Sequence, residues 1–268
     1  MKTVTIREIE CKTALSTSKL PGLTYSLNPY KGCEHNCAYC YVPNVLRIDR
    51  KRWGCFVDVK KNIPSVLSKE LKMKKRGVVG LSTVTDPYQP IEKKYKLTKY
   101  CLEQLNKYKF PVCIQTKSSL ILRDIDLLSA FDNIEVLFSI STIKKKQQQT
   151  LEPYASSINR RLTAMKKCSQ EGISTSVFFG PILPIISDHD IVESIHSFIE
   201  HGASKIWIDK LNSKPGINDN IKEKLLENSD EYNTFIKYHE KGIDYYKNKR
   251  QQIIQIGKNR NIKIIDAF

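Results

Sequence analysis

The 268-residue chain is 40% hydrophobic and 27% charged, which is enough apolar sequence for one large α/β domain or two smaller ones. No run of about 18 apolar residues occurs, which excludes a membrane-spanning helix, and the N-terminal stretch lacks the apolar centre of a secretion signal. The 44 Lys and Arg outnumber the 28 Asp and Glu, for a net charge of +16 that favours polyanionic partners but is also common in proteins from A·T-rich genomes. We expect a cytoplasmic protein and leave nucleic-acid binding open on charge alone.

Short apolar runs alternate with amphipathic ones along most of the chain. Runs rich in Val, Ile and Phe predict buried parallel strands at Thr24–Leu27, Val78–Ser82, Val112–Thr116, Ile134–Ile140, Ile173–Phe179 and Lys205–Ile208. Between them, helices are predicted at Pro64–Lys74, Leu97–Tyr108, Arg123–Ala130, Asn159–Gln170 and Asp188–Glu200. We expect Asn62 to cap the first of these helices, and Gly172 and Gly202 to end the last two in a left-handed conformation.

The C-terminal part has a different composition. Asn212–Asn220 predicts a loop, Glu223–Gln255 a long charged helical stretch, and Ile262–Ile265 a short strand. Because six β/α units precede this part, the chain predicts an α/β fold, either an open doubly wound sheet or a curved barrel. The domain division we expect is an N-terminal segment, a core and a C-terminal helical extension packed on it, at residues 1–23, 24–212 and 213–268.

Three of the eight cysteines lie within eight residues, in the sequence NPYKGCEHNCAYCY directly after the first predicted strand. Cys33, Cys37 and Cys40 have a spacing that turns three thiolates toward one point, as an iron–sulfur cluster or a zinc ion requires. No later CxxC or HxxxH pair supplies a fourth zinc ligand, although His35 lies inside the loop. Three ligands on a cluster of four irons would leave one iron without a protein ligand. The other five cysteines are scattered along the chain and are interpreted as core residues.

The CxxxCxxC spacing with an aromatic residue before the third cysteine resembles the signature of the radical S-adenosylmethionine (SAM) superfamily. The resemblance implies a partial (β/α)6 TIM-like barrel with a C-terminal helical extension, and a [4Fe–4S] cluster at the C-terminal edge of the first strand. It also implies reductive cleavage of SAM to a 5′-deoxyadenosyl radical that abstracts hydrogen from a substrate. A one-electron donor such as flavodoxin or ferredoxin would then be a partner.

Downstream blocks resemble the spore photoproduct lyase-like (DNA repair photolyase-like) group of that superfamily. These blocks are TDPYQP at 85–90, QTKS at 115–118, RDID at 123–126, FSIS at 138–141, LEP at 151–153 and RRL at 160–162. The resemblance implies that Tyr39 lies along the SAM adenine, that Lys117 pairs with the SAM carboxylate, and that Ser139 contacts its ribose or methionine part.

The same resemblance implies further roles for residues beyond strand ends. Thr85 and Asp86 would hold the SAM ammonium, while Arg161 and Glu152 would help to close the pocket. Tyr41 matches a tyrosine after the third cysteine in this group and is the catalytic candidate.

One position departs from the group. Thr83 stands where spore photoproduct lyases carry a hydrogen-donating cysteine, and threonine does not donate a hydrogen atom readily. We therefore predict a radical SAM enzyme with a nucleic-acid or nucleotide-like substrate. One alternative is a radical SAM enzyme that modifies a peptide or a small metabolite. Another, of a different class, is a nucleic-acid-binding module stabilised by zinc.

Overall fold

The structure is a computed structural model and describes residues 3–212, 214–226, 228–241 and 244–267. Within these ranges the main sheet has eight strands in the order β11-β10-β9-β8-β7-β6-β3-β2. Its strands are β2 (Leu15–Thr17), β3 (Tyr25–Leu27), β6 (Val79–Leu81), β7 (Val112–Thr116), β8 (Ile134–Ser139), β9 (Ser174–Ile182), β10 (Lys205–Lys210) and β11 (Lys263–Asp266). All neighbours pair in parallel except β2, which runs antiparallel to β3.

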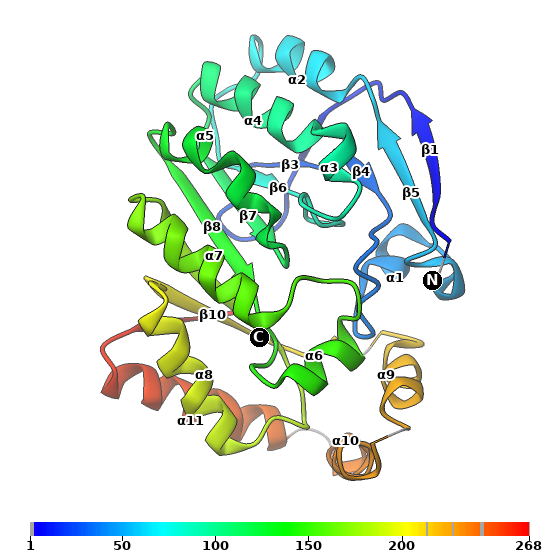
Figure 1. Cartoon of the computed structure of the whole chain (residues 1–268), viewed down its shortest axis with the longest axis vertical. Helices are drawn as coiled ribbons and strands as arrows, with labels where there is room; N and C mark the ends of the chain where they lie inside the picture. Colours follow the sequence, from blue (N-terminus) through cyan, green and yellow to red (C-terminus); the bar gives the residue numbers. More distant parts are fainter. Residues whose placement is uncertain (1–2, 213, 227, 242–243, 268) are drawn as a thin grey trace.

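Helices follow the strands and cover one face of this sheet, as Figure 1 shows for α4, α5, α7 and α8. The helices are α1 (Val42–Leu46), α2 (Ile63–Leu71), α3 (Glu92–Tyr95), α4 (Leu97–Lys107), α5 (Ile125–Ser129), α6 (Lys145–Leu151), α7 (Ile158–Gln170) and α8 (Asp188–Glu200), with the 3₁₀ turns η1 (Arg50–Arg52) and η2 (Ser119–Asp124). Right-handed β-helix-β units place their helices on one side, so the sheet curves as an incomplete barrel. The predicted α/β partial barrel with C-terminal helices is confirmed.

The two faces of the main sheet differ in burial. The face covered by helices is the more deeply buried one, and the opposite, inner face carries the site residues described below. Val136, Val177 and Ile206 are fully buried on the helix-covered face, where Phe179 meets Phe198 of α8 edge to face. Because side chains alternate along a strand, the residues between them belong to the inner face. That inner face holds Ser139 on β8, which is paired in register with Phe178 on β9.

A second, smaller sheet was not predicted from the sequence. In the described chain it has three strands, β1 (Thr5–Ile9), β5 (Phe56–Lys60) and β4 (Tyr30–Lys31), with β5 in the middle. Figure 1 shows β1 and β5 standing apart from the main sheet, beside α1. β1 is largely exposed on an edge, so its sequence lacks a continuous apolar run. The Arg7 guanidinium donates to Asp58 on β5 at 2.7 Å, which ties the N-terminal strand to its partner.

Most helices lie where they were predicted, with two corrections. Of Arg123–Ala130, the first two residues belong to the 3₁₀ turn η2 and only α5 is α-helical. Asn62 stands at the N-cap of α2 but makes no cap hydrogen bond, because its side chain bonds the backbone of Cys11 instead. Gly172 and Gly202 adopt the predicted left-handed conformation, with φ of 76° and 89°.

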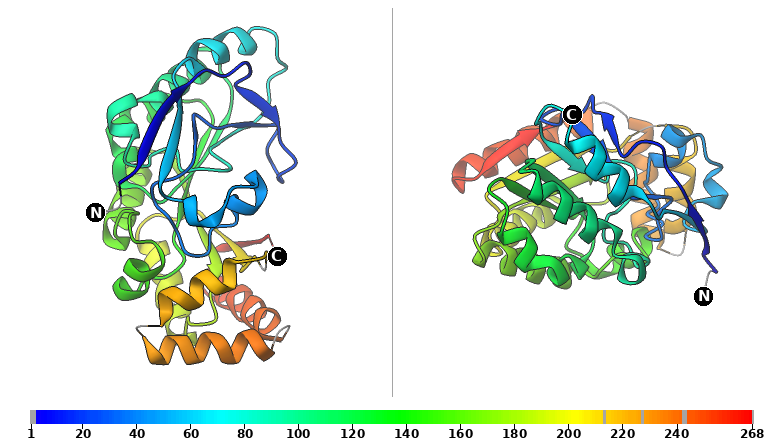
Figure 2. Two further views of the ribbon diagram at one scale, coloured as in Figure 1. Left: turned by 90° about the vertical axis from the view of Figure 1, so that its right-hand side faces the viewer. Right: turned by 90° about the horizontal axis from the view of Figure 1, so that it is seen from above.

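The C-terminal part contradicts the prediction of one long helix. The described residues form α9 (Ile217–Leu225), α10 (Ser229–Lys241) and α11 (Asp244–Asn259), and α9 begins inside the predicted loop. The predicted last strand is present as β11, which pairs in parallel with β10 and extends the main sheet. Figure 2 shows α10 and α11 at one end of the molecule, with α9 between them and the α1 region. No helix in the described ranges is both long and apolar enough to cross a membrane.

Candidate metal and cofactor site

The cysteine loop follows β3 at the C-terminal edge of the sheet, where sites form in β/α folds. Cys33 and Cys37 are buried, Cys40 is half-buried, and the Cys40 N–H donates to the Cys37 carbonyl at 3.1 Å, which closes the turn between them. Burial raises the pKa of all three thiols, to about 12 for Cys37. The charge of each of the other two cysteines also raises the pKa of Cys33, so the three thiols lie close together.

The first half of the cysteine loop is held by the segment after β6. The Thr85 hydroxyl donates to the Gly32 carbonyl at 2.5 Å, directly before the first cysteine. Gln89 accepts from the Glu34 N–H at 2.9 Å and donates to Thr85 at 2.9 Å. Since Gln89 is fully buried, these bonds are shielded from water and fix the loop. The sequence analysis quoted Gln89 only as part of a motif and gave it no role.

Asp86, in the same segment, is buried and has four partners. Its carboxylate accepts from the N–H of Tyr88 at 2.9 Å, from the Thr116 hydroxyl at 2.8 Å and from the Lys117 N–H at 2.7 Å. His35 of the cysteine loop lies 3.4 Å away through Nδ1. Burial opposes the charged form, but the His35 charge and these hydrogen bonds outweigh it and lower the pKa of Asp86 to about 2. His35 is therefore engaged with a carboxylate through Nδ1.

The second half of the loop is held by two residues that sequence reasoning missed. The Arg50 guanidinium donates to the Cys40 carbonyl at 2.9 Å and to the Asn44 side chain at 2.7 Å. The Asn220 side chain of α9 donates to the Ala38 carbonyl at 2.6 Å. The C-terminal extension thus reaches back to the cysteine loop across 182 residues of sequence. Arg50 lies in a 3₁₀ turn and Asn220 on a helix far along the chain, and nothing in the local sequence indicates that either residue bonds the cysteine loop.

We expect Asn220→Ala to lower the free energy of unfolding of the reconstituted protein by about 1 kcal/mol, the usual net value of one hydrogen bond. Its iron should be lost faster to a chelator, because the Ala38 carbonyl then lacks its partner. The measurements are urea unfolding and the time course of visible absorbance under anaerobic conditions. Asn233→Ala, at an exposed position of α10, is the matched control. Equal rates of iron loss for the two variants would contradict the bracing role.

A buried charge network lies beside the loop. The Tyr39 hydroxyl donates to Glu152, which also accepts from Ser141 at 3.0 Å. The Arg161 guanidinium, fully buried on α7, lies 2.5 Å from the other oxygen of Glu152 and donates to the Ser139 carbonyl at 2.9 Å. Burial opposes both charges, but the pair outweighs it, so the pKa of Glu152 is lowered and that of Arg161 is raised.

Lys117 directly follows β7, and its side chain reaches across to β8. Its ammonium donates to the Ser139 hydroxyl at 2.9 Å and lies 5.6 Å from the centre of the Tyr39 ring. Burial disfavours the charge, but nearby Cys37 and Glu152 outweigh it and raise the pKa of Lys117. The predicted residues Tyr39, Lys117 and Ser139 thus meet around one point.

Tyr41 lies outside this network. It is 39% exposed, and its hydroxyl donates to the Thr83 carbonyl at 3.4 Å. The Thr83 hydroxyl accepts from Asn28 at 3.4 Å. The two positions singled out by the resemblance, Tyr41 and Thr83, are therefore neighbours at the rim of the site.

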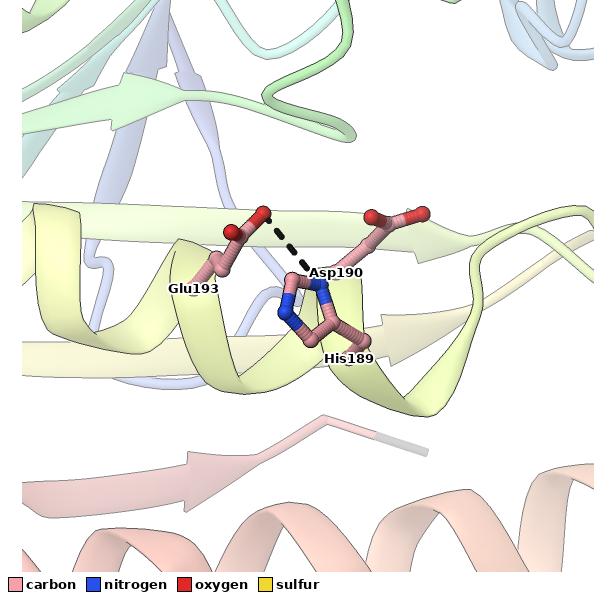
Figure 3. Close-up of side chains that lie close together, drawn as sticks. All are labelled: His189, Asp190 and Glu193. Atoms are coloured by element: carbon pink, nitrogen blue, oxygen red, sulfur yellow. Dashed lines mark ion pairs between the residues drawn. The ribbon is translucent and has the colours of Figure 1, made fainter.

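A second group of potential ligands lies on α8, away from the cysteines. His189, Asp190 and Glu193 come within reach of one another at the start of the helix, as Figure 3 shows. Lys144 lies 2.9 Å from Asp190, and Glu193 lies 3.5 Å from His189. Because these side chains already form ion pairs and two of the residues are exposed, they read as a charged helix surface.

The residues around the cysteine loop suit an iron–sulfur cluster and SAM. The loop offers three thiols, and three sulfur ligands on four irons would leave one iron open. The positive charges of Lys117 and Arg161 act on Cys37 and favour its thiolate, the form that binds iron. Within the described residues the Lys117 ammonium donates one side-chain hydrogen bond, to Ser139, so it keeps further N–H donors for a carboxylate.

A partial α/β barrel with a three-cysteine loop after its first parallel strand defines an enzyme class built around an iron–sulfur cluster. The Radical SAM superfamily model matches residues 27–198, and the chain belongs to this superfamily. It is therefore a radical SAM enzyme, whose cofactors are a [4Fe–4S] cluster and SAM. This membership rules out the alternative of a zinc-stabilised binding module.

Two curated relatives show how far the similarity extends. An uncharacterised protein of Methanocaldococcus jannaschii is 35% identical over 191 residues, which are 70% of this chain and 72% of the relative. The radical SAM Nalpha-GlyT isomerase of Pseudomonas phage M6 is 27% identical over 62% of this chain, but over only 35% of its own length.

Solved structures of spore photoproduct lyase share the fold. One cysteine-to-serine mutant of that lyase aligns over 83% of this chain and 66% of its own, with a TM-score of 0.65 and 17% identity. Another mutant, with bound SAM and dinucleoside spore photoproduct, aligns over 84% of this chain and 67% of its own, with a TM-score of 0.61 and 16% identity. This chain therefore spans about two-thirds of that lyase.

Proposed function

We propose that the chain holds its cluster on Cys33, Cys37 and Cys40 and binds SAM on the adjacent inner face, to modify a nucleic acid or a nucleotide-like substrate. The observation that carries the cofactor part is Lys117, a half-buried cation whose ammonium is bonded to Ser139 and whose pKa is raised by nearby Cys37. A cation there matches the SAM carboxylate, which would lie next to the open iron.

The other predicted residues have proposed roles that follow from their contacts. Tyr39 would present its backbone to the adenine while Glu152 holds its ring. Arg161 would keep Glu152 ionised and fix the end of β8 through the Ser139 carbonyl. Thr85, which supports Gly32, would position the cluster loop.

For Asp86 we also propose a positioning role. Its four partners include His35 of the cysteine loop and the N–H of Lys117, so it would hold these two elements together. Direct contact of Asp86 or Thr85 with the SAM ammonium stays a prediction. One experiment that addresses it is Asp86→Asn, measured for SAM affinity on the reconstituted protein.

When bound, the cluster supplies one electron that cleaves SAM to a 5′-deoxyadenosyl radical for hydrogen abstraction. The chain's residues bind and orient SAM and shield it from water, and a one-electron donor is required. We propose flavodoxin or ferredoxin as that donor, in a cytoplasmic setting. Tyr41 is the proposed catalytic residue, because its partly exposed hydroxyl lies at the rim next to Thr83.

Two observations support a nucleic-acid substrate. The net charge is +16, and each phosphate that a basic protein neutralises releases counterions. A structural relative was solved with a dinucleoside photoproduct, although at 16% identity this likeness concerns the fold. Thr83 argues against the same repair reaction, so the substrate would be a different nucleotide.

We expect the reconstituted protein to form 5′-deoxyadenosine from SAM and dithionite, and to bind single-stranded DNA or RNA in a salt-dependent way. Because phosphate contacts dominate such binding, affinity should fall steeply between about 50 and 200 mM salt. The measurements are chromatography of SAM products and fluorescence anisotropy of labelled oligonucleotides. Product formation without binding at low salt would favour a peptide or metabolite substrate. A stable cluster without 5′-deoxyadenosine would contradict the proposal.

A further inference from the structure

The inner face of the sheet continues past the proposed SAM site, onto β9 and β10. Ser139 on β8 is paired in register with Phe178 on β9, and Phe178 with Trp207 on β10. These three residues therefore form a row on one face, and strand alternation puts Asp209 on that face as well. With strands about 5 Å apart, Trp207 lies about 10 Å from Ser139.

The register between β9 and β10 shifts at one place, and the shift faces Asp209. Ile208 pairs with Phe179 and Lys210 with Ile182, so the single residue Asp209 faces two residues on β9. Such bulges change the direction of a neighbouring side chain and are common beside active sites.

Two of the inner-face side chains of β10, Trp207 and Asp209, have unused hydrogen-bonding capacity, whereas Lys205 on the same face pairs with Glu135. The Trp207 indole Nε1 is buried and has no partner in the described part of the chain. Asp209 is half-buried, and within the same ranges it forms no salt bridge. An unpaired buried N–H is costly and points to a missing partner.

Asp209 also lies near the rim residue Tyr41. Burial raises the pKa of Asp209 to about 6; burial is also the main cause that raises the pKa of Tyr41, and the Asp209 charge adds to it. By register and alternation, Asp209, Trp207 and Phe178 therefore lie on the inner face of the sheet, in the row that begins at Ser139 of the proposed SAM site. Sequence reasoning missed both Trp207 and Asp209, because each lies in or directly beside what reads as an ordinary apolar strand.

We propose that Trp207 and Asp209 are the substrate-recognition residues, and that they bind the edge of a nucleobase that carries a carbonyl and an N–H group. The indole N–H would donate to the carbonyl and the Asp209 carboxylate would accept from the N–H. Residues two apart on a strand are about 7 Å apart, a span that a planar base can bridge. The Phe178 ring on the neighbouring strand offers a surface for stacking. This inference rests on the proposed nucleotide substrate.

The test uses the anaerobically reconstituted holoenzyme with SAM and four homodinucleotides, one for each base. Binding is measured by equilibrium dialysis. For the dinucleotide that binds most tightly, we expect Asp209→Asn to weaken binding at least tenfold, because it replaces a charged acceptor. A probe methylated on the base N–H should bind the wild type as weakly as the parent probe binds Asp209→Asn.

Two further variants separate recognition from folding. Trp207→Phe keeps an aromatic ring but removes the N–H, and should weaken binding several-fold. Asp126→Asn makes the same charge change at an exposed site on α5 and should bind like the wild type. Iron content and SAM affinity, measured on each sample, identify a variant that has merely misfolded.

The outcomes distinguish the two proposals. If the wild type binds none of the four dinucleotides, the nucleotide substrate is wrong and this inference falls with it. If the wild type binds them and Asp209→Asn binds equally well, the inference alone is wrong. Loss of SAM affinity in Asp209→Asn with unchanged dinucleotide binding would also overturn it, and would assign Asp209 to the cofactor.

Discussion

Replacing Cys37 by alanine is expected to reduce the iron content from about four atoms per chain to almost none and to abolish SAM cleavage. The two thiols that remain in this loop, Cys33 and Cys40, are too few ligands to hold a four-iron cluster. Cys37 also lies between the two halves of the loop, beside Lys117. The measurements are colorimetric iron, visible absorbance and 5′-deoxyadenosine formation after anaerobic reconstitution.

Cys55→Ala is the matched control for this loss. Cys55 is half-buried and its thiol donates only to the Lys51 carbonyl at 3.6 Å, so iron content and cleavage should match the wild type. Cleavage that survives in Cys37→Ala, or iron loss in Cys55→Ala, would refute the assignment of the cluster ligands.

The second large effect is expected at Arg161. Arg161→Met removes the cation from a fully buried pair and leaves the Glu152 carboxylate buried with Lys117 as its nearest opposite charge. Loss of one partner of a buried pair costs about 3–5 kcal/mol, so the free energy of unfolding should fall by about that amount. The Ser139 and Ser156 carbonyls also lose their donors, at 2.9 and 2.8 Å. Urea unfolding of the cluster-free protein measures the change.

Two variants make this result specific. Arg160→Met changes the same residue type one position earlier on α7, where the side chain is exposed, and should alter stability by less than about 0.5 kcal/mol. The double variant Arg161→Met, Glu152→Gln should recover part of the loss, because no unpaired charge remains. A double variant less stable than Arg161→Met would show that the buried charge is not the cause.

Much of the fold was predictable from the sequence, because the parallel strands of the main sheet are short, mainly apolar runs between amphipathic helices. β7 was predicted to the residue and the other six predicted strands within a few residues. The small sheet was not predictable, because β1 is an exposed edge strand. The C-terminal helices were predicted as one because charged, helix-favouring residues continue along the sequence from one helix to the next.

The sequence by itself determined the chemistry of the site. Three closely spaced cysteines and polar residues at strand ends can be read from spacing and alternation alone, and these are local properties. Only the tertiary structure decided what supports them. Arg50 and Asn220 meet the cysteine loop from distant segments, and Trp207 and Asp209 reach the inner face through register and a bulge. Such contacts depend on how segments far apart in the chain are brought together, so no local pattern encodes them.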